Sequence, residues 1–113
     1  MSKEPLTWTD FEKVEIRTGT IIAAKTFPQA RKPAYKLTID FGSLGIKRTS
    51  AQLTTLYQVN ELVGKQVVAV VNFPPKQIAT FMSECLILGA VADDGTTTLL
   101  QTERATANGL RIA

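Results

Sequence analysis

The side chains with the clearest chemical potential in this sequence are basic, and they lie on three predicted strands. Arg17 belongs to the first strand, Lys36 to the second and Arg48 to the third. On the third strand Ser50 shares a face with Arg48, because side chains alternate between the two faces of a strand. Lys and Arg neutralise phosphates and Ser contacts the nucleic-acid backbone, so the pattern favours a nucleic-acid ligand. The alternative, an outer sheet face with ordinary solvated charges, stays open.

The charge distribution supports an anionic partner only weakly. The formal net charge of the 113-residue chain is +3. Residues 31–48 hold five basic residues, Arg31 among them, against Asp40 alone, whereas acidic residues exceed basic ones in residues 1–15. A balance this mildly basic permits an anionic partner without demanding one. Few aromatic residues are available for base stacking, which an RNA-binding platform normally uses.

A second candidate site lies between two apolar runs, Val67–Val71 and Cys85–Leu88, which we expect to be buried strands. Pro74 and Pro75 forbid ladder pairing directly after the first run, so residues 73–83 are predicted to form a loop. The loop combines apolar and polar side chains, which is typical of a binding loop on a rigid scaffold. One interpretation is an apolar groove for peptide side chains, or a nucleic-acid contact through Lys76 and Ser83. The other is a lid whose Phe81 and Met82 close the end of a barrel.

The composition argues against catalysis, metal binding and a cofactor. The chain has no histidine, which removes the usual general base and the commonest metal ligand. Its single cysteine, Cys85, lies within an apolar run and is expected to be a small core residue. No glycine-rich phosphate loop occurs, since Gly42 and Gly45 fit a hairpin. We therefore expect a binding protein and not an enzyme.

The predicted elements that position these residues are mostly strands. A capping box with Thr9 as N-cap and Glu12 at N3 predicts one short helix that ends near Val14. Polar and apolar residues alternate over 14–25, with Gly19 marking a bulge or bend, and most regularly over 35–41. A third strand is predicted over 46–52, one or two helical turns over 53–62, and short terminal strands over 97–101 and 109–112.

This pattern predicts an all-β fold with short helices, namely a five-stranded OB-fold β-barrel with terminal extensions. We expect residues 1–113 to form a single domain, since the chain is short and has no linker. No apolar run is long enough to span a bilayer and the N-terminus has no secretory signal pattern, so we expect a cytoplasmic protein without membrane insertion.

The apolar runs also bear on assembly. Val67–Val71 and Cys85–Leu88 show no polar alternation, whereas one face of a strand in a small barrel normally meets solvent. A homodimer interface is the simplest cover for the outer faces. The alternative is cover by the N-terminal helix and the C-terminal strands of the same chain.

Four segments together resemble the CsaA-type secretion chaperones of the tRNA-binding-domain superfamily, whose members are EMAP II-like OB-folds. These segments are residues 11–21 (FEKVEIRTGTI), 36–42 (KLTIDFG), 49–52 (TSAQ) and 70–75 (VVNFPP). The resemblance continues to Asn108-Gly109 and covers nearly the whole chain. It implies an export-related chaperone that forms a homodimer and binds unfolded or precursor polypeptides, a SecA-type translocation ATPase and tRNA. A stand-alone tRNA-binding module is the alternative function.

The resemblance, combined with the charge pattern, gives two sets of candidate site residues. For tRNA they are Arg17, Arg31, Lys36, Arg48, Ser50, Asn72, Lys76 and Ser83. For peptide they are Phe73, Pro74, Ile78, Phe81 and Met82. The tRNA-binding relatives carry His-Pro-x-Ala-Asp after the first strand, and residues 27–31 of this chain read Phe-Pro-Gln-Ala-Arg instead. The change removes a His and an Asp from that loop and adds Arg31.

Overall fold

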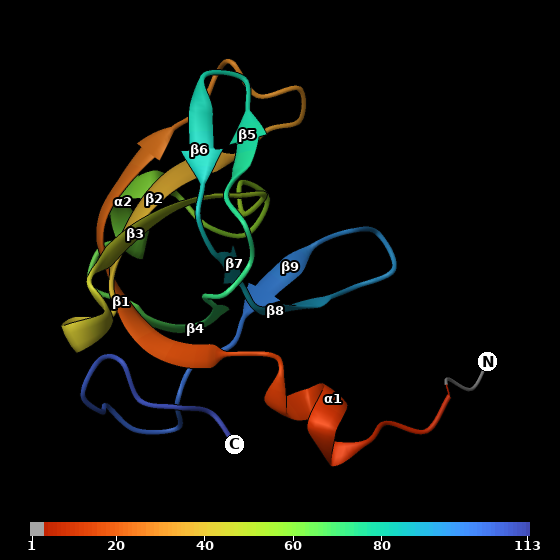
Figure 1. Ribbon diagram of the computed structural model, residues 1–113. Coiled ribbons are helices and arrows are strands. Elements are labelled where there is room, and N and C mark those ends of the chain that lie inside the picture. Colours follow the sequence, from red (N-terminus) through yellow and green to blue (C-terminus); the bar gives the residue numbers. More distant parts are fainter. Residues whose placement is uncertain (1–3) are drawn as a thin grey trace.

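A computed structural model of the protein describes residues 4–113. Its main sheet has the strand order β3-β2-β1-β4-β7 and curls into a nearly closed barrel (Figure 1). The bounds of these strands are β1 Ile16–Thr26, β2 Tyr35–Asp40, β3 Ile46–Ala51, β4 Gln66–Val70 and β7 Leu86–Ile87. The prediction of an all-β OB-fold barrel with short helices is confirmed. No helix within residues 4–113 has the length and apolar character to cross a membrane.

Two hairpins and three short helical segments complete the described residues 4–113. The hairpins are β5 Lys76–Ile78 with β6 Phe81–Ser83, and β8 Gly89–Val91 with β9 Thr97–Leu99. The helical segments are α1 Trp8–Glu12, the 3-10 turn η1 Gly42–Leu44, and α2 Val59–Leu62. In Figure 1 the β5–β6 hairpin stands above the barrel, and α1 projects away from it.

The barrel core is built on the alternation that the sequence shows most clearly. On β2 the side chains of Tyr35, Leu37 and Ile39 are buried, and the residues between them are only partly buried. Gly19 of β1 packs directly against this layer, since a Cβ atom at Gly19 would lie 2.7 Å from Ile39 Cγ2 and 2.8 Å from the Phe41 ring. Gly19 therefore serves close packing inside the barrel.

The irregularity predicted at Gly19 lies three residues further on. The register of β1 with β2 shifts between Ile21 and Ala23, which leaves Ile22 exposed. The bulge turns Ile21 and Ala24 toward the same core although three positions separate them. The smooth alternation predicted over 14–25 is thus wrong beyond Ile21.

The outer face of β4 is covered within one chain. Val68 and Val70, whose side chains share that face, are each only 7% exposed. The C-terminal segment contacts this side of the barrel, where Thr18 Oγ1 donates to the Ala107 carbonyl and Gln66 Nε2 donates to the Thr106 carbonyl. The apolar character of β4 therefore does not by itself require a second chain.

Three local predictions need correction. The cap of α1 is Thr7 and not Thr9, because Thr7 Oγ1 accepts the Asp10 N–H. The segment predicted as a loop over 73–83 contains the β5–β6 hairpin, with Ala79 turning the chain at φ 53°. The strand predicted over 109–112 is reduced to one bridge between Arg17 and Arg111.

Candidate nucleic-acid and peptide interface

Lys36 and Arg48 lie over two phenylalanine rings at one side of the barrel. Lys36 Nζ is 4.6 Å from the ring centroid of Phe27 and 5.3 Å from that of Phe81. The guanidinium carbon of Arg48 is 4.6 Å from the Phe81 centroid. The two rings meet edge to face with their centroids 5.5 Å apart. We name these four residues the cationic cluster, since attraction to the ring faces holds both positive groups in place.

No ion pair within residues 4–113 neutralises the charge of the cationic cluster. The ion pairs found within residues 4–113 involve Lys13, Arg17 and Arg104, and neither cation of the cluster. Lys25 lies opposite Lys36 in the β1–β2 register and lines the same hollow of about 160 Å³. Like charges opposite one another on neighbouring strands repel, so an anionic ligand would relieve this arrangement. Lys25 was not among the residues predicted from the sequence, because its position beside Lys36 follows only from the register of β1 with β2.

A larger groove lies between the 27–34 loop and the β5–β6 hairpin. It has a volume of about 940 Å³ and is lined by three cations, Arg31, Lys32 and Lys76. Between the cations it presents amide and hydroxyl groups of Gln29, Ser50, Gln52 and Gln77. Cations can pair with phosphates there, while amides and hydroxyls contact sugars or base edges. This basic groove brings together Arg31, Ser50 and Lys76, which the sequence places in three separate segments.

A chain of hydroxyl groups ties the β5–β6 hairpin to β3. Ser83 Oγ accepts the Ser50 N–H at 3.2 Å and lies 3.0 Å from Thr49 Oγ1. Thr49 in turn donates to the Cys85 carbonyl at 2.7 Å. The structure therefore brings Ser50 and Ser83 together, and the Ser83 hydroxyl is occupied by protein partners.

Cys85 is a core group with a thiol that stays protonated at neutral pH. Burial raises the pKa of Cys85 to about 11. Because the thiolate and not the thiol is the nucleophile, this cysteine is unreactive at neutral pH. Within residues 4–113 no group of three His, Cys, Asp or Glu side chains could hold a metal ion.

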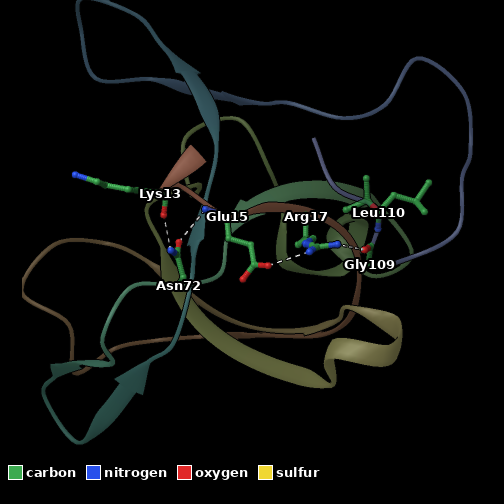
Figure 2. Close-up of polar contacts among 7 residues, drawn as sticks. Lys13, Glu15, Arg17, Asn72, Gly109 and Leu110 are labelled. Carbon is green, nitrogen blue, oxygen red and sulfur yellow. Dashed lines mark hydrogen bonds and ion pairs between the residues drawn. The ribbon is translucent and has the colours of Figure 1, made fainter. Parts of the chain in front are cut away.

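Arg17 lies among the terminal segments and does not line the basic groove (Figure 2). One of its guanidinium nitrogens pairs with Glu15 Oε2 at 2.9 Å, and another donates to the Gly109 carbonyl at 3.0 Å. Its Nε is buried without a hydrogen-bond partner among the described residues. These contacts join the start of β1 to the C-terminal segment.

Asn72 is likewise held by the chain before β1. Its Oδ1 accepts the Glu15 N–H at 3.0 Å, and its Nδ2 donates to the Lys13 carbonyl at 2.7 Å (Figure 2). The amide therefore fixes the junction between α1 and β1 against the end of β4. Like Arg17, it has partners that support a positioning role.

Replacing Asn72 with alanine should lower the free energy of unfolding by about 1–3 kcal/mol, because two hydrogen bonds to backbone groups are lost. Chemical denaturation measures the change. Asn60→Ala, at an exposed asparagine of α2, is the matched control and should change stability little. Unchanged stability together with weaker tRNA binding in Asn72→Ala would contradict the positioning role.

An apolar groove of about 320 Å³ adjoins the basic groove. Its apolar lining comes from Phe73, Pro74, Ile78, Cys85 and Leu86, and its polar lining from Ser50, Lys76 and Ser83. Phe73 is 53% exposed and Leu86 is 48% exposed, so both present apolar surface to solvent. The two grooves share Ser50, Lys76 and Ile78.

Two of the five side chains predicted to contact peptide lie outside this groove. Phe81 is only 4% exposed and forms a small second core with Phe27 and Ala34. Lys36 and Arg48 both lie over its ring, which is buried from solvent. Met82 follows it on β6 and is 43% exposed. Leu86, which the prediction omitted, lies in the groove because β7 ends the sheet beside it.

Known proteins similar to this chain include tRNA-binding domains and chaperones. Residues 16–111 match the family model described as a putative tRNA binding domain. The chaperone CsaA from Bacillus anthracis is 46% identical, with a TM-score of 0.93 over 97% of this chain and 100% of that one. The CsaA chaperone protein from Picrophilus torridus is 49% identical, with a TM-score of 0.89 over 96% and 100% of the two chains. The methionine–tRNA ligase of Methanococcoides burtonii is 32% identical over 97% of this chain, which spans only 16% of that ligase.

Proposed function

Because this chain belongs to the tRNA-binding-domain family and is similar to two CsaA chaperones, we propose that it is an export-related chaperone. It binds unfolded or precursor polypeptides and retains a basic surface for tRNA. The observation that carries the proposal is the adjacency of the two grooves. One is lined by three cations, the other is mostly apolar, and they meet at Ser50 and Lys76.

The tRNA half of the proposal rests on the basic groove and the cationic cluster. Arg31 and Lys76 border the groove. Lys36 and Arg48 lie over phenylalanine rings, and neither forms an ion pair with an acidic residue in the described part of the chain. Phosphate contacts of this kind dominate the affinity for nucleic acid and release counterions. We assign Ser50 to the same surface, and Ser83, Arg17 and Asn72 to positioning.

The polypeptide half rests on the apolar groove. Phe73, Pro74 and Ile78 line it, and Met82 on the neighbouring strand adds exposed apolar surface. An unfolded chain exposes the apolar side chains that such a surface can cover. By the same resemblance we propose precursor polypeptides and a SecA-type translocation ATPase as partners, met in the cytoplasm.

The experiment that tests both halves measures binding of labelled bulk tRNA and of a labelled, reduced and unfolded polypeptide across a salt series. The proposal predicts tRNA binding that weakens steeply as salt rises and polypeptide binding that tolerates salt. Salt-sensitive tRNA binding without polypeptide binding would favour the alternative, a stand-alone tRNA-binding module. The basic groove is the observation that favours this alternative.

We further propose a homodimer that covers α1. No residue of this five-residue helix is buried, and Trp8 and the neighbouring Leu6 are 83% and 70% exposed. A helix this short is marginal in water unless packing supports it. A second chain that covers Trp8 and Leu6 would supply that packing.

Trp8→Ser should therefore weaken dimerisation at least about tenfold, since burial of an aromatic side chain contributes a few kcal/mol to an interface. Analytical ultracentrifugation over a concentration series measures the effect. Ile46→Ser removes another exposed apolar side chain, 60% exposed on β3, and should leave the dimer intact. A monomer at all concentrations in the unsubstituted protein would contradict the dimer.

A further inference from the structure

The basic groove and the apolar groove have a wall in common. Ser50 of β3 and two residues of β5, Lys76 and Ile78, line both grooves. Lys76 and Ile78 stand two positions apart on one strand, so their side chains lie on the same face of β5. We name these three residues the shared wall. A ligand that covers the shared wall from one groove therefore covers surface that belongs to the other.

The hairpin that carries most of the shared wall is fixed at both of its ends. Near its tip, Ile78 is partly buried and packs against the small second core. At its base, Ser83 Oγ accepts the Ser50 N–H at 3.2 Å, and the Glu84 N–H donates to the Arg48 carbonyl at 2.7 Å. The hairpin moves away from β3 only if these contacts break. The two grooves therefore keep their common wall and do not separate to admit two large ligands.

Lys76 can serve either ligand, but through different parts of its side chain. It is exposed, and no ion pair within residues 4–113 includes it. Its ammonium group can pair with a phosphate in the basic groove, whereas its methylene stem can lie along an apolar ligand. In the described part of the chain it is the only charged residue that lines the apolar groove. A phosphate paired with Lys76 thus stands at the rim of that groove, where an apolar ligand would remove its water at a cost in free energy.

Both ligands are large relative to the grooves. The basic groove has a volume of about 940 Å³ and the apolar groove one of about 320 Å³, whereas a tRNA or an unfolded chain extends far beyond either. Double-stranded nucleic acid carries one negative charge per roughly 1.7 Å of helix axis. A tRNA that reaches Arg31, Lys32 and Lys76 therefore lays a row of phosphates across the shared wall. A polypeptide already bound there would keep those phosphates from Lys76.

We propose that tRNA and unfolded polypeptide exclude one another at the shared wall, so that each ligand displaces the other. The effect is reciprocal, because the factor by which tRNA weakens polypeptide binding equals the factor by which polypeptide weakens tRNA binding. Free tRNA thereby sets how much of the protein is available to polypeptide. The inference rests on both halves of the proposed function and adds the regulation of the site.

The test uses the full chain, unlabelled bulk tRNA and a dansyl-labelled, uncharged peptide of Leu, Ser and Gly, which tRNA neither attracts nor repels by charge. Fluorescence anisotropy gives the apparent Kd of the peptide at rising tRNA concentration and constant salt. Exclusion predicts that this Kd rises about tenfold when free tRNA reaches about nine times its own Kd, and that it rises further without a plateau. An apparent Kd that stays constant or reaches a plateau while tRNA saturates the protein would reveal a ternary complex. That result would overturn the inference and leave both halves of the function standing.

Each ligand is also titrated alone, which separates the inference from the proposed function. A peptide that fails to bind without tRNA would count against the polypeptide half, and a tRNA that fails to bind without peptide would count against the tRNA half. The inference would fall with either half.

A thiol introduced on the shared wall tests the overlap directly. In Lys76→Cys the other cysteine is Cys85, which is buried and has its pKa raised to about 11, so alkylation at neutral pH reports on position 76. Saturation with tRNA or with peptide should slow this alkylation about tenfold when about nine-tenths of the protein is bound, since only the free fraction reacts. Asn60→Cys, at an exposed position of α2, is the matched control, and neither ligand should protect it. Protection of position 76 by only one of two ligands that both bind would refute the shared wall.

Discussion

Replacing both Lys36 and Arg48 with glutamine should weaken tRNA binding at least about tenfold near 0.1 M salt. It should also reduce the slope of log K against log salt by about two, because each phosphate contact contributes close to one. Both cations lie over aromatic rings and have no acidic partner in residues 4–113, so their charge is available to a ligand. Fluorescence anisotropy with labelled bulk tRNA at several salt concentrations measures both quantities.

The matched control for this prediction carries the same change in charge. Lys13→Gln with Arg104→Gln removes two cations that are exposed and paired with Asp10 and Glu103. We expect these substitutions to change tRNA affinity by less than about twofold, since long-range charge effects are screened at this salt concentration. Equal losses in the two double variants would show that tRNA responds to net charge and not to the cationic cluster.

Phe81→Ala should lower the free energy of unfolding by about 3–5 kcal/mol, the usual cost of truncating a buried aromatic residue. The Phe81 ring is 4% exposed and contacts Phe27 edge to face. Its removal leaves a cavity in the small core that joins the β5–β6 hairpin to the 27–34 loop. The variant should also lose tRNA affinity, because Lys36 and Arg48 lose the ring over which both lie. Urea denaturation measures the stability.

Met82 provides the control for Phe81, because it is the next residue of β6 and is 43% exposed. Met82→Ala should cost less than about 1 kcal/mol, as surface substitutions usually do. If Met82→Ala weakens binding of the unfolded polypeptide while stability holds, the apolar surface extends across the hairpin. A Phe81→Ala variant as stable as Met82→Ala would contradict the burial of Phe81.

The barrel was largely predictable because β2 carries a clear period of two and apolar runs mark its neighbours. Tyr35, Leu37 and Ile39 alternate in the sequence and are buried in the structure. The bulge at Ile22 was not predictable, because it depends on the register with β2 and no residue type marks it. The β5–β6 hairpin was missed because three-residue strands are too short to show a period.

The candidate site was predictable as a set of residue types and not as an arrangement. The structure brings four of the predicted cations to one side of the barrel, namely Arg31 from the 27–34 loop, Lys36 from β2, Arg48 from β3 and Lys76 from the β5–β6 hairpin. Their contact with tRNA stays a prediction. Arg17 lies elsewhere because its guanidinium pairs with Glu15 and donates to the Gly109 carbonyl. The contact with Gly109 spans 92 positions of sequence, so no local pattern predicts it. Phe81 could not be assigned to the interior without knowing that Phe27 lies beside it.

The most direct test of the proposed tRNA surface is amide chemical-shift mapping of the protein during titration with bulk tRNA. The structure leads us to expect the largest changes in residues 29–36, 48–52 and 76–83, which contain most of the basic groove and the cationic cluster. Changes confined to residues 13–17, Asn72 and 109–111, around Arg17, would contradict the assignment and place the tRNA surface on the terminal segments.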